Sequence, residues 1–230
     1  MKDTLTPTNN ISPWLENLPL EWDQIIRYGT RLKLKKQEII FHQYDTAHYI
    51  YIVADGRVRL FLNSLSGEEK ALSIIGKNGL IGECGFFEPH NYITCAITAS
   101  QTLLYRIPRG DFAQLVKENQ QLMEQLVYLV NYKYRLLCTQ TLQLSYSKAL
   151  NRVCEALVHL ATNYGEQISE TEIKISINFT HQELANLVGT TRITVIKTLK
   201  YLEQHQIVVR KNKFYYIQDY QTLLDLIEEE

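Results

Sequence analysis

Runs of apolar residues with two different periods divide the chain into three parts. Between about residues 30 and 108 the runs are short, several alternate with polar positions, and they are rich in β-branched and aromatic residues. They read RLKLKK, EIIFHQ, HYIYIV, RVRLFLN, KALSII, YITCAIT and TLLYRIP. Turn signals separate them, among them Asp55-Gly56, Ser66-Gly67, Lys77-Asn78-Gly79 and Glu88-Pro89. Many short strands predict an antiparallel roll of the jelly-roll type, and the stretch from Trp14 to Tyr28 predicts a short helix packed on it.

A helical period replaces the strand pattern after Arg109. Residues 111–144 contain no glycine or proline, and leucine recurs every seven residues. This pattern predicts one long helix with an apolar seam, and such a seam is typical of a parallel homodimer. The predicted seam residues are Leu115, Leu122, Leu126, Leu129 and Leu136. The alternative is a helix that lies along its own domain. Asn119, Lys133 and Gln140 are polar positions of the same heptad pattern, and such positions set register or serve a site.

The C-terminal third is helical again and ends in a short hairpin. The helical runs read SKALNRVCEALVHLATNYG, THQELANLVG and TRITVIKTLKYLEQHQ. Two strand-like runs, IVVR and KFYYIQ, meet at Lys211-Asn212-Lys213, and YQTLLDLIEEE predicts a terminal amphipathic helix. The chain is therefore expected to be α+β, with a β-roll over residues 1–110, a dimerisation helix and hinge over 111–146, and a winged helix-turn-helix over 147–230.

Composition excludes several classes of protein. Hydrophobic residues make up 45% and charged residues 21% of the chain, as in ordinary globular domains. No apolar run approaches membrane length and the N-terminus lacks a signal-peptide pattern, so we expect a cytoplasmic protein without a membrane partner. The four cysteines form no C-x-x-C pair. We expect reduced thiols and no metal site, with a redox switch as the alternative.

The residues from Thr180 onward predict a helix-turn-helix. Thr180 and Glu183 have the spacing of a capping box, which begins a helix that ends at Gly189. A second helix follows within two residues, capped by Thr190 or Thr191. Two short helices joined by a glycine-containing turn place the second one in the major groove of DNA.

The local charge favours this interpretation. The net charge of the chain is −1, but residues 189–213 hold six basic residues and one acid. A basic patch of this kind is typical of DNA binding, whereas the alternative is a solvated face of an ordinary helix pair. The candidate DNA-contacting residues are Thr180, His181, Gln182, Thr190, Thr191, Arg192, Ile193, Thr194, Lys197, Lys200, Lys211 and Lys213.

The order of elements and several segments resemble the Crp/Fnr family of bacterial transcription regulators over essentially the whole chain. IIFHQYDTAHYIYIVADGRVRL is similar to the family's roll signature, IGECGFFEP to its phosphate-cassette loop, and FTHQELANLVGTTRITVIKTLKYLEQ to its helix-turn-helix. The resemblance implies a cytoplasmic homodimer that binds a twofold-symmetric site on double-stranded DNA and recruits or blocks RNA polymerase.

The resemblance also assigns three base-reading positions, which fall at Arg192, Ile193 and Lys197. Arginine can bind guanine through O6 and N7. Many members have a glutamate where this chain has Ile193, and isoleucine can only touch a thymine methyl. We therefore expect a half-site that is richer in A·T pairs than the best-known family consensus.

The loop LIGECGFFEPHNYITC matches only half of the family's cyclic-nucleotide cassette. Gly82 and Glu83 stand where members that bind cyclic nucleotides hold the ribose. Ile93-Thr94 replaces the Arg-Ser or Arg-Thr pair that holds the phosphate, and no arginine occurs between Arg59 and Arg106. A buried phosphate would lack its bidentate partner. We expect an effector other than cyclic AMP.

Other ligands of the family need other residues. The iron–sulfur branch uses an N-terminal cysteine cluster, but no cysteine precedes Cys84, and the histidines at 42, 48 and 90 fit surface positions better than haem ligation. Neither cofactor is expected. A small anionic or aromatic effector fits a pocket between roll and helix, resembling the halophenol-sensing branch; the alternative is that the tyrosines only pack and the lysine is solvated. The candidate residues are Gly82, Glu83, Phe86, Tyr92, Ile93, Thr94, Tyr128, Tyr132 and Lys133.

Catalytic patterns are absent from the sequence. We find no nucleophile motif, paired carboxylates, P-loop or metal-ligand spacing, so the chain is not expected to be an enzyme. Within the DNA-binding class, a ligand-independent or cysteine-redox-controlled regulator is the alternative to an effector-controlled one. Outside that class, the alternative is a protein-interaction scaffold that uses the two modules without binding DNA.

Overall fold

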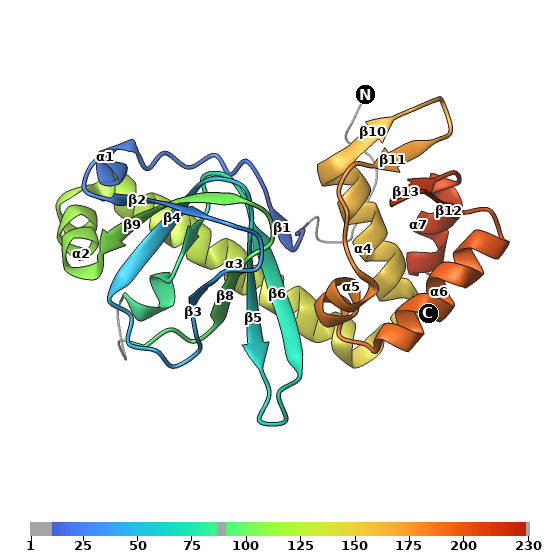
Figure 1. Ribbon diagram of the computed structural model, residues 1–230, viewed down its shortest axis with the longest axis horizontal. Helices are drawn as coiled ribbons and strands as arrows, with labels where there is room; N and C mark the ends of the chain where they lie inside the picture. Colours follow the sequence, from blue (N-terminus) through green and yellow to red (C-terminus); the bar gives the residue numbers. More distant parts are fainter. Residues whose placement is uncertain (1–10, 87–90, 229–230) are drawn as a thin grey trace. The chain divides into compact units, whose positions relative to one another are not determined.

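The chain folds into two compact units in the computed structural model, which describes residues 11–86 and 91–228. The first unit comprises residues 1–139 and the second residues 140–230; Figure 1 shows both as ribbons. The boundary lies inside the long helix, so the predicted middle segment 111–146 is divided between the units. None of the helices in the described ranges has the length and apolar character needed to cross a membrane.

Two β-sheets form the roll of the first unit. One has the strand order β1-β6-β5-β8-β3 and the other β2-β9-β4-β7. All pairings are antiparallel except that of β1 with β6. The strands are β1 (Trp14–Leu15), β2 (Thr30–Leu34), β3 (Ile39–Phe41), β4 (Tyr49–Asp55), β5 (Val58–Asn63), β6 (Glu69–Ile75), β7 (Leu80–Ile81), β8 (Cys95–Thr98) and β9 (Thr102–Pro108). The predicted antiparallel roll is confirmed, and each of the seven predicted runs contains a strand. The turn predicted at residues 88–89 lies outside the described residues.

The helix predicted from Trp14 to Tyr28 is wrong over most of its length. Only Asp23–Ile26 (α1) is helical, and Trp14–Leu15 (β1) forms a strand beside β6. The Ile74 amide of β6 donates to the Pro13 carbonyl, and the Gly76 amide, directly after β6, donates to the Leu15 carbonyl. Pro13 and Pro19 explain the difference, because proline removes a backbone donor and restricts the preceding residue to extended backbone.

The long helix is also interrupted, at Asn119. Helix α2 covers Arg109–Glu118 and helix α3 covers Gln120–Tyr146, with extended backbone at Asn119 between them. The Asn119 side-chain oxygen accepts a hydrogen bond from the Leu122 amide at 3.1 Å, so asparagine caps the start of α3. One continuous helix over 111–144 is therefore wrong.

The predicted dimer seam faces the protomer's own core. Leu122, Leu126, Leu129 and Leu136 are 2%, 2%, 0% and 3% exposed and belong to the hydrophobic core of the first unit. Leu115, which lies on α2 and not on α3, packs partly buried against the same core. Four of these side chains are buried without a partner chain and Leu115 is partly buried in the same core, so their assignment as a seam is wrong and the alternative, a helix along its own domain, holds for this stripe. The exposed apolar residues of α3 are Val127, Tyr128, Val130, Tyr134, Leu137, Leu142, Leu144 and Tyr146.

The second unit contains the predicted winged helix-turn-helix. Its sheet has the order β10-β11-β13-β12, and its elements are α4 (Ala149–Tyr164), β10 (Gly165–Gln167), β11 (Ile173–Ile175), α5 (His181–Val188), α6 (Arg192–Gln204), β12 (Val208–Lys211), β13 (Phe214–Ile217) and α7 (Tyr220–Glu228). The hairpin β10–β11 was not predicted, because its strands are short and β10 is exposed along its whole length.

Truncation of Leu129 tests the orientation of α3. We expect Leu129→Ala to lower the free energy of unfolding by about 2–5 kcal/mol, because it opens a cavity in the core of the first unit. Gln121→Ala removes an exposed polar side chain of the same helix and should change it by less than about 0.5 kcal/mol. Urea unfolding of the two variants measures the difference, and equal effects would contradict this orientation.

Candidate nucleic-acid interface and ligand pocket

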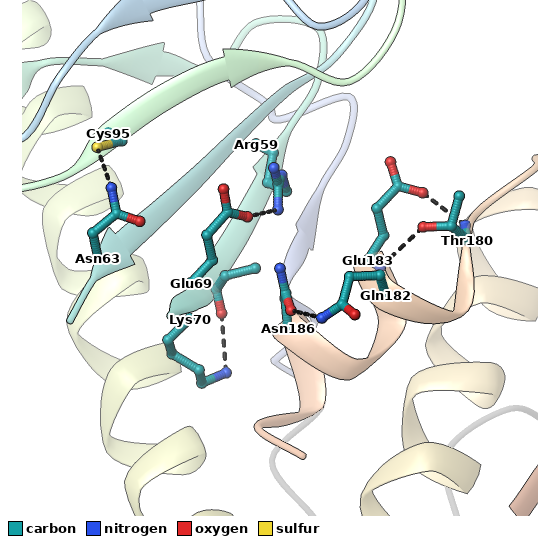
Figure 2. A network of polar contacts seen from close by, with 10 residues as sticks. Arg59, Asn63, Glu69, Lys70, Cys95, Thr180, Gln182, Glu183 and Asn186 are labelled. Atoms are coloured by element: carbon teal, nitrogen blue, oxygen red, sulfur yellow. Dashed lines mark hydrogen bonds and ion pairs between the residues drawn. The ribbon is translucent and has the colours of Figure 1, made fainter. Parts of the chain in front are cut away.

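The first helix of the helix-turn-helix starts with a complete capping box. The Thr180 hydroxyl accepts from the Glu183 amide at 3.1 Å, and the Glu183 carboxylate accepts from the Thr180 amide at 2.7 Å; both are drawn in Figure 2. Helix α5 ends at Gly189, whose φ of 68° is left-handed and therefore suits glycine. The sequence signal for both ends of α5 is confirmed.

Helix α6 begins at a second cap and presents a mixed basic and apolar face. The Thr191 hydroxyl accepts from the Thr194 amide at 3.1 Å, so Thr191 rather than Thr190 is the cap. Val195, Thr198, Leu199 and Leu202 are buried. The exposed residues of α6 are Arg192, Ile193, Lys197, Lys200, Tyr201, Glu203 and Gln204.

Tyr201 was missed by the sequence reasoning. It is 39% exposed and follows Ile193 and Lys197 at four-residue intervals, so the three side chains share one face of α6. Its ring lies 4.3 Å from that of His205. The helical spacing alone would have been enough to find it.

The two lysines of the wing differ in their surroundings. The turn at Asn212 has a φ of 59° and joins β12 to β13. The Lys211 ammonium lies 2.5 Å from the Glu172 carboxylate, which comes from the β10–β11 hairpin. Lys213 is exposed. Lys213 is thus the better candidate for a phosphate contact. Lys211 would have to break its ion pair with Glu172 before it could bind a phosphate.

Two of the polar side chains at the start of α5 already have partners. His181 Nε2 lies 2.9 Å from the Tyr215 hydroxyl, and Gln182 donates to Asn186 at 2.6 Å (Figure 2). Burial, followed by the charges of Arg210 and Arg192, lowers the pKa of His181 below its ordinary value. In the free protein these surroundings favour the neutral imidazole, which can contact DNA as a hydrogen-bonding group.

A cavity of about 260 Å³ lies in the first unit between the loop after β7 and helix α3. Six of the nine predicted pocket residues line it, namely Gly82, Glu83, Tyr92, Ile93, Thr94 and Lys133. The remaining lining residues were not predicted, and most are apolar: Leu60, Leu72, Ser73, Cys84, Val130, Tyr134, Leu136 and Leu137. Strand positions such as Leu60 and Leu72 carry no local signal that they face a ligand.

Phe86, Tyr128 and Tyr132 do not line this cavity. Phe86 is 7% exposed and packs edge-on against Phe112 at 5.5 Å. The Tyr132 hydroxyl donates to the Ser12 carbonyl at 3.4 Å, and Tyr128 is 48% exposed. Their assignment to the pocket is wrong, because residues 128 and 132 turn to other sides of α3 than residue 133.

An ion pair closes one wall of the cavity. The Lys133 ammonium lies 2.7 Å from the Glu83 carboxylate and donates to the Leu80 carbonyl at 2.9 Å. The Glu83 side chain is only 5% exposed. The two charges compensate each other, so the pocket offers a ligand mostly apolar walls.

Comparison with known proteins agrees with both units. The family model of the cyclic nucleotide-binding domain matches residues 31–119, and that of the Crp-like helix-turn-helix domain matches residues 151–226. The cyclic AMP receptor protein of Thermus thermophilus is 30% identical over 86% of this chain and 88% of its own length. The chain belongs to the Crp/Fnr family of transcription regulators.

Solved structures of other Crp/Fnr proteins share the fold. A CooA mutant from Carboxydothermus hydrogenoformans has a TM-score of 0.75 at 22% identity, covering 90% of this chain and 91% of that one. The c-di-GMP-responsive regulator CLP from Xanthomonas campestris has a TM-score of 0.74 at 19% identity, covering 84% and 95%. The helix-turn-helix match and the curated relative, and not these structures, show that this Crp/Fnr chain is a DNA-binding transcription regulator.

The cysteines of this Crp/Fnr chain are free thiols. Burial, followed by the Glu83 charge, raises the pKa of Cys84 to about 12, and burial raises that of Cys154 to about 12. Cys95 is buried as well. Because the thiolate is the form that reacts, Cys84 and Cys154 are poor redox switches.

Removal of Lys133 tests the buried ion pair. Lys133→Met leaves the Glu83 carboxylate buried without a cation, with the Cys84 thiol as a weak donor, and should lower the free energy of unfolding by about 3–5 kcal/mol at neutral pH. Denaturant unfolding at neutral pH measures the loss.

Two further variants give the controls. The double variant Lys133→Met/Glu83→Gln should recover most of the lost stability, and Lys117→Met, at an exposed lysine of α2, should change it by less than about 0.5 kcal/mol. An equal loss in the single and double variants would contradict an energetic role for the pair.

Proposed function

We propose that this Crp/Fnr regulator acts in the cytoplasm as a homodimer on twofold-symmetric DNA, under the control of a small effector other than cyclic AMP. The observation that carries the proposal is the Lys133–Glu83 pair at the pocket loop. The carboxylate that stands where family members hold a ribose already accepts a hydrogen bond from the chain's own lysine.

The phosphate-holding half of the loop supports the same conclusion. Ile93 and Thr94 line the cavity, and no arginine occurs between Arg59 and Arg106. A phosphate diester in this cavity would lose its water shell without gaining a guanidinium. The surrounding walls are contributed by Leu60, Leu72, Val130, Leu136 and Leu137, and they favour a compact aromatic ligand. An anionic one must compete with Glu83 for Lys133.

The exposed face of α3 supports a homodimer. Val127, Val130, Tyr134 and Leu137 are 59%, 44%, 65% and 43% exposed and follow one another at three- or four-residue steps. Contiguous apolar residues on a helix surface are typical of a protein interface. A second copy of α3 would bury this stripe, whereas the leucines on the opposite side stay in the core of each protomer.

The start of α6 supports reading of an A·T-rich half-site. Arg192 is exposed and offers two parallel donors to guanine O6 and N7. Ile193 is 66% exposed and has no polar atom, so its favourable contact in the groove is a thymine methyl. Bound to such a site, the dimer would recruit or block RNA polymerase.

Two substitutions separate base reading from phosphate binding. Arg192→Ala should weaken binding by about 1–3 kcal/mol, mainly through one base pair of each half-site. Lys213→Ala should weaken binding to all sequences alike and reduce the slope of affinity against salt. Titrations on a selected operator and its single-base variants distinguish them, and unchanged sequence preference in Arg192→Ala would refute base reading by Arg192.

A thermal-shift screen tests the effector class. We expect small aromatic compounds to raise the Tm of the first unit, and cyclic AMP to leave it unchanged, because binding to the folded state alone stabilises it. Leu72→Trp fills the cavity and should abolish the shift. A saturable rise of Tm with cyclic AMP would overturn the proposed effector class, and equal operator affinity with and without every bound compound would indicate a ligand-independent regulator.

A further inference from the structure

Arg152, in the first turn of α4, joins two parts of the second unit. Its Nε donates to the Val188 carbonyl at 2.8 Å and its Nη2 to the Gly189 carbonyl at 3.1 Å. Its Nη1 donates to the Ser147 carbonyl at 2.5 Å and approaches the Gln143 carbonyl at 3.5 Å. All four partners are backbone oxygens.

Each pair of carbonyls marks the end of a helix. Gln143 lies in the last turn of α3 and Ser147 directly follows it, while Val188 and Gly189 end α5. The last carbonyls of a helix carry its negative partial charge; the Gln143 carbonyl also accepts from the Ser147 amide at 3.0 Å, so Arg152 is its second donor. The planar guanidinium has five donors in a fixed fork, so one arginine can cap both ends at once.

The junction between α3 and α4 has a second link beside Arg152. The Gln143 side chain donates to the Glu155 carboxylate at 2.5 Å, and Glu155 lies one turn after Arg152 on α4. The end of α3 is therefore tied to α4 through both its backbone and a side chain. The turn at Gly189 is joined to the same place through Arg152.

The position of Gly189 determines where α6 begins. Only Thr190 and Thr191 separate it from Arg192, and Thr191 is the cap of α6. Because this connection is only two residues long, displacing the Gly189 carbonyl moves the start of α6, where the exposed Arg192 and Ile193 lie. Lysine could not replace the arginine, because its single nitrogen does not reach both carbonyl pairs in one plane.

We propose that Arg152 is the positioning residue that holds the recognition helix α6 in fixed register with the end of α3. A displacement of the last turn of α3 then also moves the start of α6, because Arg152 prevents the turn at Gly189 from adjusting independently. This inference builds on the DNA-binding role of α6, and its first measurement needs no DNA.

Hydrogen exchange of the free protein is the first measurement. Arg152→Gln should speed amide exchange in peptides covering residues 143–147 and 186–195 together. The matched control is Lys148→Gln, which removes a charge at the start of the same helix where the side chain makes no cap hydrogen bond; it should leave both regions unchanged. Unchanged exchange in Arg152→Gln would overturn the proposal.

The second measurement compares DNA affinities. A misplaced α6 loses base contacts but keeps phosphate contacts, so Arg152→Gln should reduce the ratio of specific to non-specific affinity by about tenfold or more, a loss comparable to about one mismatched base pair. Lys148→Gln should keep the wild-type ratio. An unchanged ratio in Arg152→Gln would count against the proposal.

Arg152→Lys covers the case in which Arg152→Gln does not fold. This variant keeps the charge, and we expect it to keep wild-type protection from amide exchange in only one of the two regions. Full protection in both regions would show that the fork-shaped guanidinium is not needed. If the wild-type protein shows no sequence preference at all, the proposed reading of DNA fails, while the exchange experiment still decides the role of Arg152.

Discussion

The apolar stripe of α3 has to be buried against the roll, and most features of the first unit depend on this packing. Leu122, Leu126 and Leu129 recur at three- or four-residue steps, Leu136 follows two turns later, and all four are almost fully buried. A helix has only one rotation about its axis that buries such a stripe. That rotation fixes what every other residue of α3 faces: Val127 points to solvent, whereas Val130 and Tyr134 are exposed and also line the cavity. Packing against the roll thus determines which side chains of α3 lie in the core and which remain exposed for an interface.

Lys133 lies on the same stripe, four residues after Leu129 and three before Leu136. Its ammonium is carried into a place where a charge needs a partner, and Glu83 supplies one at 2.7 Å. The glutamate comes from the turn at Gly82, where a φ of 87° favours glycine. The Lys133 ammonium therefore ties the loop that shapes the pocket to the helix that closes it, through the Glu83 carboxylate and the Leu80 carbonyl, within a mostly apolar wall.

Local chemistry explains which features could be predicted from sequence. The strands of the roll, the capping box at Thr180 and the turn at Gly189 are encoded by neighbouring residues, and the structure contains them all. The heptad of leucines correctly predicted a stripe, but period alone does not say what covers the stripe. The break between α2 and α3 comes from the Asn119 side chain, which caps α3. The absence of glycine and proline around it favoured an unbroken helix.

Features that depend on distant contacts could not be read from sequence. The pairing of Trp14–Leu15 with β6, the partner of Lys133 and the apolar strand residues in the cavity depend on segments that are far apart in sequence. Tyrosines at residues 128 and 132 looked equivalent to Lys133 as pocket residues. Their direction depends on the rotation of α3, which only the packing of the whole unit determines.

The Lys211–Glu172 pair changes how the charge of the DNA-binding unit should be counted. Six basic residues stand between residues 189 and 213, but one ammonium is already neutralised by a carboxylate of the neighbouring hairpin. Each cation that meets a phosphate releases counterions, and a cation that keeps its internal partner releases none. The DNA affinity of this wing should consequently fall less steeply with salt concentration than six free cations would imply. The regulator would then stay bound over a wider range of cell salt concentrations.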